Sequence, residues 1–177
     1  MTSSVKPELT DRYGNAIPEW YHGYVKAIGN NNFRDLLERN LDNTTELMNS
    51  VSPEKENFAY APGKWTTKEV LLHYIDTERI FACRALCFSR NDKTNLPGFD
   101  ENSYTPNSGA QHRTMESLKK EYVAVRNSTI ELFKNFDENF LCKTGSANNY
   151  IFSVELCGII IVGHEMHHLK ILKERYL

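Results

Sequence analysis

Residues 153–177 read SVELCGIIIVGHEMHHLKILKERYL. Counting three, four and seven positions from His164 and His168 selects four apolar residues, namely Cys157, Ile161, Ile171 and Leu172. This spacing lines one face of an α-helix. The stretch therefore predicts a long helix that begins near residue 153 and runs to the end of the sequence. Its core-facing stripe is apolar except for two imidazoles one turn apart.

Three other stretches carry the same helical periodicity. The first covers about 33–51, where Asn30-Asn31-Asn32 supplies cap residues and Ser52-Pro53 stops the helix. The second opens with Thr66-Thr67-Lys68-Glu69, a capping box, and runs to about Ser89. The third covers about 114–135. Together with residues 153–177 they predict an all-α protein, a four-helix bundle, since almost nothing alternates as a strand would.

The N-terminal segment precedes this bundle. A short helix is predicted over 18–28, because Pro18 suits the first turn of a helix. Residues 1–17 are expected to form an extended or flexible arm. We expect residues 1–177 to form a single domain, since the length suits one domain with a real core.

Residues 90–113, RNDKTNLPGFDENSYTPNSGAQHR, join the second and third predicted helices without a helical pattern. Loops longer than about 12–15 residues are usually functional or disordered. Leu96, Phe99 and Tyr104 offer apolar anchors, which favours an ordered loop packed over one end of the bundle. A plain crossover connection explains the segment equally well. If the loop reaches the site, Tyr104 is a candidate substrate contact.

Composition narrows the classes of partner. The formal net charge of −2 gives neither a basic footprint for nucleic acid nor a cationic face for a membrane. No apolar run approaches the ~20 residues of a membrane span. The polar start of the sequence lacks a signal peptide. A cytoplasmic protein with a small-molecule substrate is expected, and a homodimer through an outer face suits bundles of this kind. The four cysteines are expected to be buried free thiols: Cys83, Cys87, Cys142 and Cys157.

The histidine pair on the last helix is the chemical signal. Two histidines at i and i+4 can reach one cation. Without partners, each buried imidazole would cost on the order of 1–3 kcal/mol. Two satisfied core histidines remain an alternative, and a third histidine on a facing helix would decide the matter. His73 in KEVLLHYIDTER is that candidate, since its helical face is more polar than a core stripe. His22, His112 and His167 are weaker candidates.

His164-Glu165-Met166-His167-His168 also matches the H-E-x-x-H motif of zinc proteases. Those enzymes take their third ligand from downstream of the motif. Here the late candidate is Glu174, six residues after His168 on the same predicted helix, with no turn to bring it back. A third ligand from upstream is favoured instead, which again selects His73.

The chain resembles the DinB/YfiT superfamily, and most closely its branch of DinB-like metalloenzymes. The resemblance rests on LLHYIDTERIFACRAL around His73, LPGFDENSY in the long loop and GHEMHHLKILKERYL at the end. It extends over about 21–177 and includes PGKW at 62–65. It implies a four-helix bundle with one divalent metal bound by His73, His164 and His168. It also implies enzymes that act on low-molecular-weight thiols, although many members have no assigned reaction.

Three neutral imidazoles would leave a metal with its positive charge and an open position, which is typical of catalytic sites. Zinc and nickel suit this donor set best, and iron, cobalt and copper are also compatible with it. Such a metal lowers the pKa of a bound water or thiol. Three carboxylates, Glu165, Asp76 and Glu78, are candidate catalytic groups, with Asp76 one turn from His73 as an acceptor for its ring. Arg84 is a candidate for binding an anionic substrate. Each of these four also has a purely structural interpretation as one member of an ion pair.

Three functions follow as hypotheses. A metal-dependent transferase that uses a low-molecular-weight thiol predicts a basic or polar pocket beside the metal. A metal-dependent hydrolase predicts a carboxylate near the metal-bound water. A non-catalytic bundle tied together by its metal predicts no open coordination position. The sequence favours the three hypotheses in that order, and it separates the transferase from the hydrolase only slightly.

Overall fold

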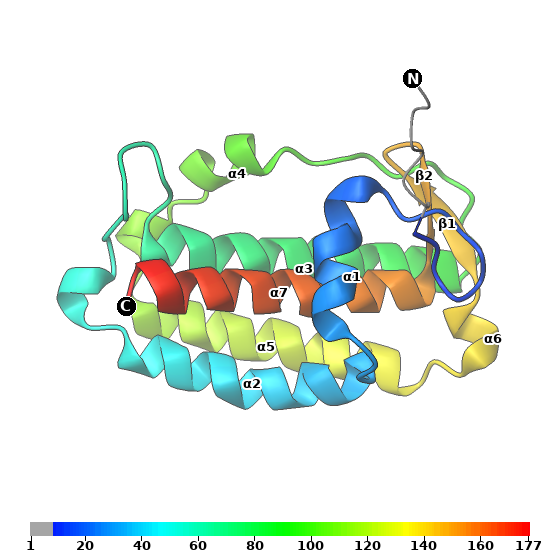
Figure 1. Cartoon of the computed structure of the whole chain (residues 1–177), viewed down its shortest axis with the longest axis horizontal. Coiled ribbons are helices and arrows are strands. Elements are labelled where there is room, and N and C mark those ends of the chain that lie inside the picture. The colour runs from blue at the N-terminus through cyan, green and yellow to red at the C-terminus, as the bar shows by residue number, and fades with distance from the viewer. Residues whose placement is uncertain (1–8) are drawn as a thin grey trace, which may run out of the picture.

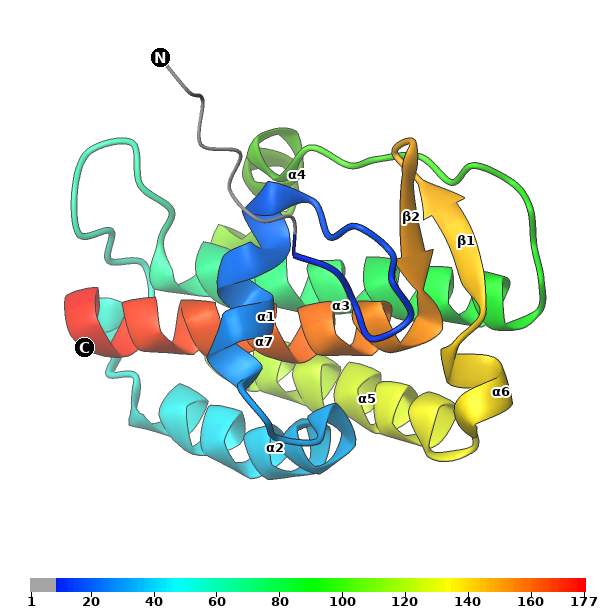
Figure 2. The same cartoon turned by 45° about the vertical axis from the view of Figure 1, so that its right-hand side comes forward.

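The computed structural model describes residues 9–177 (Figures 1 and 2). Its long helices are α2 (Phe33–Ser50), α3 (Thr67–Ser89), α5 (Met115–Lys134) and α7 (Val154–Arg175), which lie side by side in one bundle. Their ends differ from the predicted ends by at most two residues. The prediction of an all-α four-helix bundle is therefore confirmed. Residues 1–8 of the predicted extended arm lie outside the described residues.

Each long helix begins at a residue whose side chain accepts a backbone N–H of the first turn. Asn32, Thr66, Thr114 and Ser153 occupy these positions. At Thr66 the capping box is complete, since the Glu69 carboxylate also accepts the Thr66 N–H at 2.7 Å. Such caps satisfy N–H groups that have no partner inside the helix. They explain why the four starting points could be read from the sequence.

The long connection between α3 and α5 follows from the direction of these two helices. Figure 1 shows that both run the same way along the bundle, so the chain must return along the whole length of α3 before α5 begins. The 23 residues of α3 span about 35 Å. The segment is therefore a crossover connection, and Figures 1 and 2 show it running along one side of the bundle.

The expectation that residues 90–113 lack helical structure is wrong in two places. This segment contains α4 (Glu101–Asn107) and the 3₁₀ helix η3 (Ala110–His112). Asp100 caps α4, because its carboxylate accepts the Asn102 N–H at 3.0 Å. A helix of two turns is too short to show periodicity, and this one contains Pro106, a residue that helix interiors disfavour.

A short β-hairpin was also missed. After α6 (Glu138–Leu141), strands β1 (Thr144–Ala147) and β2 (Tyr150–Ser153) pair antiparallel. Asn148 and Asn149 form the turn with φ values of 50° and 63°, which asparagine tolerates better than most residues. Leu96 of the crossover is bonded to the hairpin, donating its N–H to Ser146 O at 2.9 Å. The hairpin therefore holds the crossover at the end of the bundle where α3 ends.

The N-terminal segment packs across α7. The predicted helix over 18–28 is split into η1 (Glu19–Tyr21) and α1 (His22–Ile28), and α1 crosses α7 (Figure 2). The crossing depends on Gly163, where an added Cβ would lie 2.3 Å from the backbone oxygen of Tyr24. Only glycine allows the two backbones to approach so closely.

The hydrophobic core consists of two clusters separated by a layer of buried polar side chains. One apolar cluster includes Phe33, Phe88 and Phe133, and the other includes Met48, Leu71 and Leu172. Between them, every long helix contributes buried polar residues: Asn40, Thr44, His73, Thr77, Glu78, Arg126, Thr129, His164, Glu165 and His168. This polar layer contains every histidine of the predicted metal site.

Two further expectations concern the cysteines and membranes. All four thiols are free, but only Cys157 is buried, while Cys83 and Cys142 are exposed and Cys87 is intermediate. The prediction of buried thiols is wrong for these three, because the outer face of α3 and the end of α6 carry them to the surface. Among the described residues, no helix has the length and apolar character needed to cross a membrane.

Candidate metal centre

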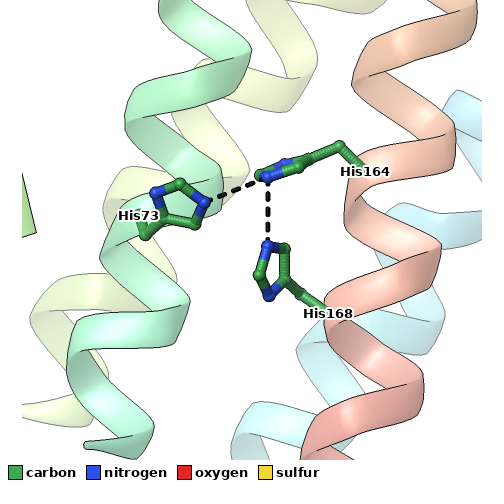
Figure 3. Close-up of side chains that lie close together, drawn as sticks. All are labelled: His73, His164 and His168. Carbon is green, nitrogen blue, oxygen red and sulfur yellow. Dashed lines mark hydrogen bonds between the residues drawn. The ribbon is translucent and has the colours of Figure 1, made fainter. Parts of the chain in front are cut away.

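Three histidines from two helices meet within the polar layer (Figure 3). His73 comes from α3, while His164 and His168 come from successive turns of α7. The Nε2 atom of His164 lies 3.0 Å from Nε2 of His73 and 3.0 Å from Nε2 of His168. Ligand atoms of all three lie within 4.8 Å of one another. The facing-helix histidine expected from the sequence is therefore adjacent to the terminal pair.

Hydrogen bonding among these rings does not satisfy the three nitrogens. A neutral imidazole nitrogen carries either one N–H or one lone pair. Nε2 of His164 would have to share a single N–H between two acceptors, or a single lone pair between two donors. A divalent cation would instead accept one lone pair from each ring. Metal–nitrogen bonds of about 2.0–2.1 Å place two ligand atoms roughly 3.0–3.4 Å apart. The three-histidine cluster could therefore bind a metal ion.

Burial keeps these imidazoles neutral. Desolvation lowers the pKa of His73 from 6.5 to about 4 and that of His168 to about 3. For His164, desolvation and then the neighbouring rings of His168, His73 and His167 lower the pKa well below its ordinary value. Neutral imidazoles offer the lone pairs that a metal requires.

These pKa shifts predict acid sensitivity of the metal-free protein. The folded-state pKa values lie below the unfolded value of 6.5, so the unfolded chain takes up protons first. The free energy of unfolding should therefore fall as the pH drops below 6.5, by about 1.4 kcal/mol per pH unit for each of these histidines. Urea midpoints measured between about pH 4 and pH 7 on chelated protein test this.

Two controls sharpen that measurement. His168→Leu should have a shallower dependence on pH than the wild type, whereas a substitution of the exposed His112 should leave it unchanged. A slope identical in the wild type and His168→Leu would show that the buried rings do not titrate as described.

Aromatic side chains hold two of the three rings. The Trp65 ring lies 4.7 Å from the His73 ring, centroid to centroid, and Tyr24 of α1 packs edge-on against His164 at 5.2 Å. The close crossing of α1 over α7 at Gly163 therefore brings Tyr24 to the site. Ring contacts of this kind restrict the orientation of the two imidazoles before any ligand binds.

The histidines line a cavity of about 360 Å³, which falls in the size range of small-molecule sites. Its walls come from α1, α3, α7, the crossover and the hairpin. Aromatic rings dominate the lining, together with a few polar groups: Trp20, Tyr21, Tyr24, Trp65, Phe81, Phe99, Tyr150, Phe152, Thr77, Arg84, Glu101 and Asn148. The nitrogens that would bind a metal therefore face a space large enough for a substrate.

Comparison with known proteins agrees with this fold. The family model of the DinB superfamily matches residues 36–172, which span α2 to α7 and all three histidines. This chain belongs to the DinB superfamily. The resemblance inferred from the motifs is thereby confirmed.

A solved structure similar to this DinB protein is that of YfiT from Bacillus subtilis. The TM-score is 0.70 at 15% sequence identity, over 94% of this chain and 91% of that one. YfiT is described as a probable metal-dependent hydrolase with an unusual four-helix bundle topology. At this identity the likeness shows a shared fold. No curated protein matches the chain in a sequence comparison.

Two of the predicted catalytic carboxylates of this DinB protein bind to a buried arginine. Arg126 Nη2 lies 2.8 Å from Glu78 Oε2 and 2.9 Å from Glu165 Oε2, and all three side chains are at most 2% exposed. Glu165 also accepts hydrogen bonds from Asn40, Thr44 and Tyr122. Neither carboxylate lines the cavity. The structure therefore engages both carboxylates with Arg126, away from the cavity lining.

The third predicted carboxylate, Asp76, lies partly exposed beside Arg79 at 3.5 Å. Among the described residues no hydrogen bond joins it to the His73 ring, so the predicted orienting contact is not formed. Arg84 lines the cavity, as a substrate-binding residue would. Tyr104 is half exposed and packs against Phe99, outside the cavity lining.

Among residues 9–177, Glu101 is the one carboxylate that lines the cavity, and it was not predicted as a site residue from the sequence. It lies in the first turn of α4, and its charge contributes to raising the pKa of Tyr24, after the larger effect of burial. The sequence signal was Asp100-Glu101, a cap followed by an acid that suits a helix N-terminus. It went unrecognised because α4 itself was not predicted.

Proposed function

We propose that this DinB protein is a metal-dependent hydrolase with a small-molecule substrate. One observation carries the proposal: three buried, neutral imidazoles direct Nε2 atoms at a single point on the wall of an aromatic cavity. When bound there, a divalent ion would lower the pKa of a water molecule in its open position. The description of YfiT as a probable metal-dependent hydrolase supports the same class. Zinc and nickel suit the donor set best, ahead of iron, cobalt and copper.

Residues of the chain provide the remaining functions. Glu101 accepts the proton that hydrolysis releases, because it is the carboxylate on the cavity wall. Tyr24 and Trp65 hold the imidazoles of His164 and His73 in place. Glu165 and Glu78 have a structural role, since Arg126 and its neighbours engage them behind the site.

A transferase that uses a low-molecular-weight thiol is the second candidate. One observation favours it: Arg84 places a positive charge in the cavity, where an anionic thiol cofactor could bind. The non-catalytic bundle receives no such support, because the histidines line a substrate-sized space and are not sealed into the core.

The test compares hydrolysis with thiol transfer in one experiment. Untagged protein loaded with zinc or nickel is incubated with a panel of esters, thioesters and amides in ¹⁸O-labelled water, with and without added thiols. A hydrolase should release ¹⁸O-labelled acid without thiol, and a transferase should form a thiol adduct only. Glu101→Gln should lower kcat for hydrolysis, while Glu116→Gln on the exposed face of α5 should not. Equal turnover by wild type and His164→Ala would refute both candidates.

A further inference from the structure

Arg84 lies at the opposite end of the cavity from the histidines. It is eleven residues after His73 on α3, which places it on the same helical face about 16 Å along the axis. Its side chain is 4% exposed, yet it lines the cavity together with Thr77 and Phe81, which lie between it and His73 on the helix. The cavity therefore has a metal-ligand cluster at one end and a guanidinium at the other.

The positive charge of Arg84 has no counterion among the described residues 9–177. Its Nη2 donates a hydrogen bond to the backbone oxygen of Pro97 at 3.0 Å, and the guanidinium also interacts with the uncharged hydroxyl of Tyr21. Around it lie aromatic rings, with centroids 4.7 Å away for Phe81, 5.8 Å for Phe152 and 6.0 Å for Phe99. Ring faces stabilise a cation, but they do not neutralise it.

A second buried arginine, Arg126, has its charge neutralised by carboxylates. Arg126 binds Glu78 through both Nε and Nη2 and also contacts Glu165. A buried charge without a partner is costly, which is why buried arginines are usually paired. The two arginines have similar burial and opposite pairing, and the unpaired one faces the cavity.

Anchoring the crossover does not by itself account for Arg84. One carbonyl, that of Pro97, needs one N–H donor, and a neutral amide would supply it without burying a charge. A guanidinium has five N–H donors in a planar fork that matches a carboxylate. The donors left over beside the cavity are the feature that calls for a ligand.

We propose that the substrate is an apolar carboxylic acid whose carboxylate binds Arg84 and whose reactive bond lies at the three histidines. This inference rests on the proposed hydrolase and names its class of substrate. A single carboxylate matches the single arginine, while Glu101 on the same wall disfavours a more highly charged anion such as a phosphate. Phe81, Phe152 and Ile160 contact the apolar part of the molecule between its two ends. The carboxylate and the reactive bond are separated by less than about 16 Å.

The test is a binding measurement that needs no turnover. Zinc-loaded full-length protein is titrated calorimetrically with ω-phenylalkanoates of increasing chain length and with the corresponding neutral primary amides. The best acid should bind wild type at least about tenfold more tightly than its amide. In Arg84→Met that preference should vanish, and in Arg84→Lys part of it should remain. Arg79→Met is the matched control, since Arg79 is exposed on the same helix, and it should keep the full preference.

Three results would overturn the proposal. They are equal binding of acid and amide to wild type, an undiminished preference in Arg84→Met, and no saturable binding by any acid of the series. The wild-type comparison stands even if Arg84→Met fails to fold. An Arg84-dependent preference in a protein without hydrolytic activity would uphold the anion site and refute the hydrolase. Hydrolysis without this preference for the acid would uphold the hydrolase and refute the anion site.

Discussion

Replacing Arg126 by methionine is expected to lower the free energy of unfolding by about 3–5 kcal/mol. Arg126 is fully buried, donates three hydrogen bonds to the Glu78 carboxylate, two from Nε and one from Nη2, and also contacts Glu165 through Nη2. Methionine fills a similar volume, so packing changes little. The substitution leaves two buried carboxylates facing each other without their cation.

The pKa of Arg126 supports this expected loss of stability. Burial by itself would lower it, but Glu165 and Glu78 outweigh that effect and hold the pKa well above its ordinary value. The guanidinium therefore stays charged, and the two carboxylates depend on it. Urea denaturation at neutral pH, with constant m-value, measures the loss.

Two comparisons isolate the cause. Arg79→Met removes an exposed ion pair with Glu121 and should cost less than about 1 kcal/mol. Adding Glu78→Gln and Glu165→Gln to Arg126→Met should recover part of the lost stability, because the charges left unpaired are then gone. If Arg126→Met costs no more than Arg79→Met, the buried pairs do not stabilise the fold as argued.

The bundle could be predicted because its signals are local and repeated. The capping box at Thr66 and Glu69 and the stripe around His164 and His168 each specify a helix from neighbouring residues alone. Helices of 18–23 residues give several turns of periodicity, so single misleading positions do not matter. The short elements α4 and β1–β2 have too few residues for periodicity to appear.

The histidine cluster could be predicted for a related reason. His164 and His168 share a face through helix geometry, and only His73 had to be supplied by the fold. The role of a single carboxylate depends on the direction in which its side chain points from the helix. Periodicity alone does not determine which neighbours lie in that direction. Glu165 adjoins His164 in sequence yet points about 100° away around the helix, toward Arg126. Glu101 lies far from every histidine in sequence, and the crossover brings it to the cavity.

His73→Ala is expected to weaken binding of zinc or nickel by at least about 100-fold. Loss of a group that merely orients a ligand typically costs 10–100-fold in affinity, so loss of a ligand should cost more. The ring is also the sole link from α3 to the cluster, since the other two ligands are on α7. At a metal concentration of about 1,000 times Kd, binding stabilises a protein by about 4 kcal/mol. The rise in Tm on metal addition should therefore largely disappear in His73→Ala.

The matched control for this prediction is His167→Ala. His167 adjoins His168 on α7, is exposed, and is absent from the group of converging ligand atoms. Its removal should leave both the metal content of untagged protein and the metal-dependent rise in Tm close to wild type. Competition titration against a chromophoric chelator gives the affinities directly. Equal affinity in His73→Ala and wild type would mean that the two histidines of α7 bind metal without α3, and the three-histidine centre would have to be abandoned.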